Sequence, residues 1–153
     1  MDASLDTLLY GMQFRRLLEK ELQPLEQQYG LYRIDMHILL YLDYAGEHNT
    51  SKSIMELNMF TRGHISQALS RLQKKGFVRM EQDLEDRRCT HNYLTEHARD
   101  AIASIKESYR KIYRIVMDGI TDEEQGLLVK VAEKVNQNIS FGLEISSYLE
   151  KHF

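Results

Sequence analysis

The sequence of 153 residues has one cysteine, one proline and no tryptophan. The single cysteine, Cys89, excludes an internal disulfide and is typical of a protein in a reducing cytoplasm. One proline and eight glycines exclude a low-complexity chain and favour long helices. No apolar run reaches the roughly 18 residues that cross a membrane, and the N-terminus lacks the layout of a signal peptide. The composition therefore predicts a cytoplasmic protein that does not enter a membrane.

Charge is distributed unevenly along the chain. The net charge is −3, which by itself argues weakly against a partner of high negative charge. Residues 58–92, however, hold seven basic and four acidic side chains, whereas the remainder holds thirteen basic and nineteen acidic ones. A locally basic segment in an acidic body is typical of a surface that binds a polyanion, and a plain solvated charged face is the alternative.

Most of the chain has the periodicity of amphipathic helices, in which apolar residues recur every three or four positions. Thr61 suits the N-cap of one helix and Gly76 its end, while Thr121 and Glu124 form the signature of a capping box. Pro24 is expected to kink or end the first helix, because proline removes a backbone donor and crowds the preceding turn. The predicted helices lie at 3–29, 33–45, about 52–58, about 62–75, 95–117 and 121–150.

Two short runs interrupt the helical pattern. FVRMEQ (77–82) and CTHNYL (89–94) alternate apolar and polar side chains, as half-buried strands do, and the loop DLEDRR (83–88) joins them. The order helix, short helix, tight turn, helix, hairpin predicts a winged helix-turn-helix. The side chains of the hairpin that we expect to face the core are Phe77, Val78, Tyr93 and Leu94.

The helix before the hairpin has one apolar face and one face without acids. Ile65, Leu69 and Leu72 share the apolar face at 100° per residue. A solvent face in an acidic protein usually carries Glu or Asp, yet none stands between Arg62 and Lys75. The outward face carries hydrogen-bond donors and acceptors, which are the groups that read base edges in the major groove of DNA. Glutamine, for example, can pair in bidentate fashion with adenine. The outward residues are Gly63, Gln67, Ser70 and Lys74, with His64, Ser66 and Arg71 at the edges of that face.

The stretch ISQALSRLQKKGFVRMEQDLEDRRCTHNYLTEHA resembles the core of the MarR (multiple antibiotic resistance regulator) family of bacterial transcription factors. The shared features are a helix that ends in RLQKKGFVR, an Asp-x-Arg within DRR, and LT at the start of the next helix. The resemblance covers essentially all of residues 1–153, which would form a single MarR-like chain. It implies a mainly α fold with a small β-hairpin wing. A winged helix-turn-helix over 33–94 would be flanked by N- and C-terminal dimerisation helices over 1–30 and 95–153.

The resemblance also implies a homodimer that binds a pseudo-palindromic operator on double-stranded DNA, mostly as a repressor, with release by a small-molecule effector in many members. By position, the wing arginine of the family falls on Arg88 and its orienting partner on Asp86, while Arg87 would reach phosphate or solvent. An arginine at the wing meets the enhanced negative potential of a narrow minor groove. The expected DNA-binding residues are Thr61, Arg62, Gly63, His64, Ser66, Gln67, Ser70, Arg71, Lys74, Asp86, Arg87 and Arg88.

Effector pockets in the family lie between the winged unit and the dimerisation helices. Aromatic and methionine residues at helical spacing suit such a pocket, although the same stripe is also typical of an ordinary core. We expect no cofactor and no bound metal. The candidate pocket residues are Tyr10, Met12, Phe14, Met36, His37, Tyr41, Tyr109 and Tyr113.

Two features differ from the pattern of the family. The turn before the recognition helix often contains glycine, whereas here it reads Asn58-Met59-Phe60. Peroxide-sensing members have a reactive cysteine near the N-terminus, whereas the one cysteine here lies at position 89. We interpret Cys89 as an ordinary strand residue, with a redox role as the alternative.

Three other functions compete with the regulator. The first is an enzyme, but the sequence has no glycine-rich phosphate loop and no nucleophile with a plausible base nearby. The nearest arrangement is Cys89 with His91 on one face of a strand, and no third catalytic group accompanies them. A metal-responsive regulator of the same fold would have to assemble its ligands from distant histidines, since their spacing is not that of a ligand set. A winged helix that contacts only proteins would differ by showing no salt-dependent binding to DNA.

Overall fold

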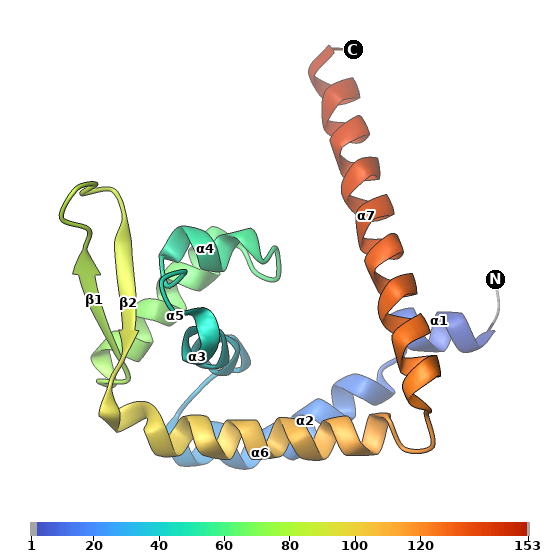
Figure 1. The fold of residues 1–153 in the computed structure, drawn as a ribbon, viewed down its shortest axis with the longest axis horizontal. Coiled ribbons are helices and arrows are strands. Elements are labelled where there is room, and N and C mark those ends of the chain that lie inside the picture. Colours follow the sequence, from blue (N-terminus) through green and yellow to red (C-terminus); the bar gives the residue numbers. More distant parts are fainter. Residues whose placement is uncertain (1–2, 153) are drawn as a thin grey trace. The chain divides into compact units, whose positions relative to one another are not determined.

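The computed structural model describes residues 3–152, apart from the side chains of Leu9, Tyr10, Tyr148 and His152. The chain forms two compact units, one that ends at Ile112 and one that begins at Tyr113. Figure 1 shows the order of the elements along the chain. They are α1 (Ala3–Tyr10), α2 (Gln13–Tyr29), α3 (Arg33–Ala45), α4 (Ser51–Glu56), α5 (Arg62–Lys74), β1 (Val78–Gln82), β2 (Thr90–Leu94), a 3₁₀ turn η1 (Glu96–Ala98), α6 (Arg99–Val116) and α7 (Asp122–His152).

The first predicted helix is two helices, and the break lies at Gly11 rather than at Pro24. The backbone N–H of Gly11 donates to the carbonyl of Thr7 at 2.8 Å and closes α1. A side chain at position 11 would collide with that carbonyl, so glycine permits the tight end. We expected Pro24 to kink or end the helix, and the second of these expectations is wrong, because α2 continues to Tyr29. The buried neighbour Leu25 anchors the helix to the core beyond the hydrogen bond that proline removes.

The core of the first unit lies between α2, α3, α5 and α6. Figure 1 shows α2 and α6 running alongside each other, and two polar contacts join them. Lys111 forms an ion pair with Glu21 at 2.6 Å, and the hydroxyls of Tyr29 and Ser104 lie 3.3 Å apart. The apolar side chains with the least exposure include Leu22, Met36, Ile38, Leu39, Ile65, Leu69, Leu72 and Ile105.

Side chains at the helix ends fix the helix-turn-helix. Thr50 caps α4 by accepting from the N–H of Ser53 at 3.1 Å. The predicted cap of α5 is confirmed, since Thr61 Oγ1 accepts from the N–H of His64 at 3.3 Å. In the turn between the two helices, Asn58 has a φ of +54°. Asparagine tolerates this left-handed conformation better than other non-glycine residues, so it replaces the glycine that the family often has there.

The hairpin is antiparallel, with Val78 opposite Leu94 and Arg79 opposite Tyr93. The expectation that Tyr93 faces the core is wrong, because it is exposed and Asn92 is the buried residue of β2. Successive side chains of a strand point to opposite faces, so burying Asn92 turns Tyr93 outward. There the guanidinium of Arg79 lies 4.9 Å from the ring of Tyr93.

The LT motif closes the base of the hairpin. Thr95 Oγ1 donates to the carbonyl of Gly76 at 2.5 Å, and the N–H of Thr95 donates to the carbonyl of Phe77 at 3.1 Å. Gly76 has a φ of +75°, as expected for the residue that ends α5. The motif therefore joins the end of α5 to the start of α6.

The second unit consists mainly of α7. The predicted capping box is confirmed, because Glu124 accepts from the N–H of Thr121 at 2.9 Å and Thr121 Oγ1 accepts from the N–H of Glu124 at 3.2 Å. The apolar side chains that recur at helical spacing along α7 are exposed in the single chain. They are Leu127, Leu128, Val131, Val135, Ile139 and Leu143. Among the described residues, no helix has both the length and the apolar character to span a bilayer.

Candidate nucleic-acid interface

Helix α5 presents the face that the sequence predicted. Ile65, Ala68, Leu69 and Leu72 are buried, whereas the other residues between them are exposed apart from the half-buried Arg71. Above Gly63, an added Cβ would meet no atom within 4 Å, so a partner can approach the backbone there. The last turn of α5 carries basic side chains and the first turn carries no acid. The exposed residues of the predicted interface on this helix are Thr61, Arg62, Gly63, His64, Ser66, Gln67, Ser70 and Lys74.

Arg71 has contacts that the sequence did not predict. Its Nη2 donates to Asp35 Oδ1 at 2.7 Å, and its Nε donates to Asp35 Oδ2 at 3.3 Å. Asp35 is fully buried near the start of α3. The guanidinium also lies 4.7 Å from the centre of the Tyr32 ring. These hydrogen bonds raise the pKa of the Arg71 guanidinium.

Asp35 also caps its own helix. Its Oδ2 accepts from the N–H of Tyr32 at 2.9 Å, which satisfies one free donor at the start of α3. The carboxylate therefore fixes the start of α3 and the last turns of α5 at the same time. The acid three residues after the N-cap was the only sequence signal for Asp35, and it pointed to a cap rather than to Arg71.

The wing loop holds Asp86 and Arg88 together. The N–H of Arg88 donates to Asp86 Oδ1 at 3.0 Å, and its Nε donates to the same oxygen at 3.4 Å. The Arg88 side chain is 94% exposed, so its remaining donors are free to meet a ligand. The predicted contact between these residues is therefore present. Arg87 is exposed in the same loop, and its carbonyl accepts from Gln82 at 3.4 Å.

A cavity of about 350 Å³ lies between α3, the turn before α5, and α6. Of the candidate effector residues, His37, Tyr41 and Tyr109 line it, and the Tyr109 hydroxyl lies 3.3 Å from His37 Nε2. Burial, reinforced by nearby Arg33, lowers the pKa of His37, and burial raises the pKa of Tyr109. The other lining residues are Ile38, Leu40, Tyr44, Ile54, Leu57, Met59 and Phe60.

Of the remaining effector candidates, Met12, Phe14 and Met36 do not line this cavity. Met36 is fully buried in the core, because it lies on the face of α3 that packs inward. Met12 and Phe14 are exposed at the start of α2. Tyr113 belongs to the second unit, and the side chain of Tyr10 lies outside the described part of the chain.

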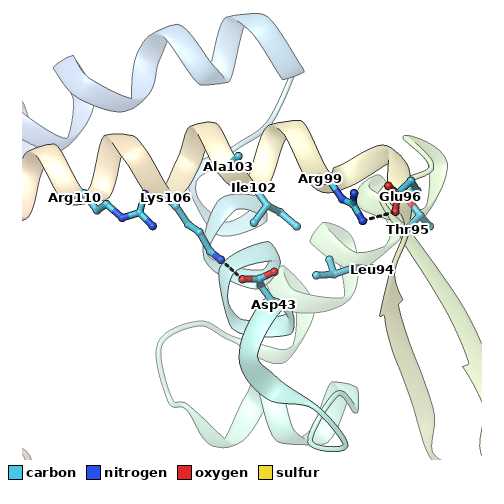
Figure 2. A pocket seen from close by; sticks show the side chains of 9 residues that line it. All are labelled: Asp43, Leu94, Thr95, Glu96, Arg99, Ile102, Ala103, Lys106 and Arg110. Carbon is cyan, nitrogen blue, oxygen red and sulfur yellow. Dashed lines mark hydrogen bonds and ion pairs between the residues drawn. The ribbon is translucent and has the colours of Figure 1, made fainter.

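A second hollow, of about 440 Å³, lies along α6 (Figure 2). Arg99 donates to Glu96 at 2.9 Å, and Lys106 forms an ion pair with Asp43 of α3. Figure 2 shows the Arg99–Glu96 pair at one end of the hollow and the Lys106–Asp43 pair farther along α6, with Ile102 between the two pairs. Because these cations already have carboxylate partners, we assign the hollow no ligand.

The part of the chain that contains α5 and the hairpin matches the model of a known protein family. The model of the family described as "Transcriptional regulator SarA/Rot" matches residues 20–105, from α2 into α6. The chain belongs to this family. Solved structures similar to the chain include a MarR family regulator from Silicibacter pomeroyi, 26% identical, with a TM-score of 0.70 over 88% of this chain and 87% of that one. The fold and family of this SarA/Rot member are those of MarR-type transcriptional regulators and not of enzymes.

Curated relatives carry matching descriptions. The HTH-type transcriptional regulator Hpr of Lysinibacillus sphaericus is 27% identical over 124 residues, which is 74% of this chain and 64% of Hpr. The chain thus spans less than two thirds of the length of Hpr. YwaE of Bacillus subtilis, an HTH-type transcriptional regulator, is 29% identical over 136 residues, which is 89% of this chain and 78% of YwaE. The MepR–DNA complex of S. aureus shares the fold, at 16% identity and a TM-score of 0.73 over 90% of this chain and 98% of that one.

Proposed function

We propose that this SarA/Rot family member binds double-stranded DNA with α5 in the major groove and the wing in the adjoining minor groove. The observation that carries the proposal is the exposed pair of Asp86 and Arg88 beside an exposed helix face without acids. The MepR structure of the same fold contains DNA, which supports this arrangement.

The residues of α5 divide into three roles in this proposal. Gln67, at the centre of the exposed face, reads a base edge, since its amide can pair in bidentate fashion with adenine. Lys74 contacts phosphate at the last turn. Arg71 positions α5 through Asp35 and is not assigned a phosphate, because its guanidinium is held by that buried carboxylate. The other exposed residues of the face, Thr61, Arg62, Gly63, His64, Ser66 and Ser70, line the groove.

In the wing, Arg88 enters the minor groove and Asp86 orients it. An exposed arginine alone would sample many conformations, whereas the Asp86 carboxylate limits those of Arg88. Arg87 contacts phosphate or solvent. The two winged units of a dimer would then meet two half-sites of a pseudo-palindromic operator.

The assembly in this proposal is a homodimer that represses transcription. The apolar face of α7 is too extensive for a free surface, since contiguous exposed apolar patches usually mark interaction sites. A small apolar effector would enter the cavity beside His37 and Tyr109 and release the DNA. Both groups line an apolar space near α5, so a ligand there can bias the position of the recognition helix.

Selection of DNA from a random pool by the full chain tests this function. We expect an enriched motif with two related half-sites, and an affinity that falls steeply as salt concentration rises. Binding to unselected DNA should be weaker by about a thousandfold or more. No enrichment, together with binding that is absent or insensitive to salt, would leave the winged helix as a protein-interaction module.

A further inference from the structure

Asp83 organises the turn of the wing. Its Oδ1 accepts from the N–H groups of Glu85 and Asp86, both at 2.9 Å, and its own N–H donates to the carbonyl of Cys89 at 2.9 Å. The backbone hydrogen bond from Asp86, with further hydrogen bonds from His91 and Glu85, lowers the pKa of Asp83 to about 2. The carboxylate is therefore ionised at any pH near neutrality.

His91 joins this turn to the helix-turn-helix. Its Nε2 lies 2.8 Å from Asp83 Oδ2, and its Nδ1 lies 2.7 Å from Asn49 Oδ1. The His91 side chain is only 23% exposed. Asn49 stands just before Thr50, which caps α4 and also pairs with His91 through a backbone bridge.

Asn49 is itself held firmly. It is 5% exposed, and its carbonyl accepts from the backbone N–H of Asn92 at 3.0 Å and from the Asn92 side chain at 2.9 Å. A continuous chain of hydrogen bonds therefore runs from the start of α4 through His91 to the wing turn. At the far end of that turn, Asp86 contacts Arg88.

We propose that His91 is a positioning residue for DNA binding: by forming hydrogen bonds with Asn49 and Asp83 together, it fixes where the wing presents Arg88 relative to α5. This inference rests on the proposed function, because it needs Arg88 to contact DNA. It assigns His91 no contact with DNA.

The two side-chain contacts of His91 join the wing turn to the segment before α4. Asp83 is an ionised acceptor, so the ring nitrogen that faces it donates. The other ring nitrogen shares a hydrogen bond with the side chain of Asn49.

A double-mutant cycle on the selected operator tests the positioning role. The variants are Arg88→Ala, His91→Gln and the double variant, with Thr90→Ala on the same strand as the control. We expect His91→Gln to weaken binding about threefold or more in the parent and to have no further effect once Arg88 is absent. Circular dichroism and the thermal midpoint should show that each variant is folded, and His91→Ala provides a second substitution if His91→Gln is not.

The outcomes separate the two claims. If Arg88→Ala binds like the parent, the proposed wing contact fails. If Arg88→Ala weakens binding but the loss from His91→Gln simply adds to it, only the positioning role of His91 is overturned.

Discussion

The guanidinium of Arg71 on the recognition helix and the buried carboxylate of Asp35 on α3 form an ion pair with two hydrogen bonds, at 2.7 and 3.3 Å. The Arg71 side chain is 31% exposed, whereas Asp35 has no contact with solvent. Arg71 can therefore regain water if the pair is broken, but Asp35 cannot. The pair makes the position of α5 depend on the start of α3.

Removal of Arg71 should destabilise the fold strongly. We expect Arg71→Ala to lower the free energy of unfolding by about 3–5 kcal/mol, because a buried carboxylate loses its partner. Lys106→Ala is the matched control, since its partner Asp43 is 30% exposed, and it should cost about 1 kcal/mol or less. Urea denaturation of both variants measures the difference, and equal losses would show that Asp35 does not depend on Arg71.

Gln67 and Lys74 should differ in what they contribute to binding. Gln67→Ala is expected to relax the preference at one position of each half-site by about 1–3 kcal/mol. Lys74→Ala should weaken all sequences alike and reduce the slope of affinity against salt by about one charge. Titrations with the operator and its single-base variants check both outcomes. The assignment of roles fails if the two substitutions alter sequence preference in the same way.

Arg88→Ala should cut operator affinity at least about tenfold, or about 1.4 kcal/mol, with little change in thermal stability. Asp86→Ala should give a smaller loss of the same kind, because the arginine remains but is less ordered. Glu85→Ala is the control, since it removes a neighbouring acid without touching Arg88. Should Asp86→Ala and Glu85→Ala both tighten binding, the acids merely repel DNA and Asp86 does not orient Arg88.

Asn58 should tolerate glycine and resist other substitutions. Its φ of +54° disfavours residues with a Cβ, so Asn58→Ala should lower the free energy of unfolding by about 1–2 kcal/mol. Asn58→Gly should be close to neutral, since glycine adopts this conformation without strain. Chemical denaturation of the two variants measures the contrast. A turn that accepts alanine and glycine equally would not need a left-handed residue.

The apolar face of α7 should hold the dimer together. We expect Val131→Lys combined with Val135→Lys to shift the protein from dimer to monomer, because two charges would enter an apolar interface. Glu133→Lys with Gln137→Lys is the control, since it adds two lysines at the same spacing on the opposite face of the helix. Sedimentation velocity at micromolar concentration reads the result. A stable, folded parent monomer at that concentration would contradict the dimer itself.

Local patterns in the sequence were sufficient for α5, for the hairpin, for the start of α7 and for the exposed face of α5. Periodicity depends only on residues a few positions apart, so it placed α5, the hairpin and the caps at Thr61 and Thr121. The contact between Asp86 and Arg88 was also predictable, because two residues in one tight loop can be related by spacing alone.

Predictions from helix and strand propensities were wrong at Pro24 and Tyr93, where tertiary packing outweighs the local preference. Pro24 remains within α2 because Leu22 and Leu25 are buried, and Tyr93 faces outward because Asn92 takes the inward position. The turn at Asn58 needed a left-handed residue, and no pattern in the sequence indicated which residue would adopt that conformation.

Only the tertiary structure decided which distant polar groups meet. Arg71 and Asp35 are 36 residues apart, and His91 and Asn49 are 42 residues apart. No periodic signal links positions at such separations, and each residue alone reads as an ordinary surface charge, cap or loop amide. Folding brings them into sites that exclude water, where a hydrogen bond left unmade is costly. The sequence thus determined which face of α5 is exposed, and the packing of α3, α4 and β2 determined how that face and the wing are held in place.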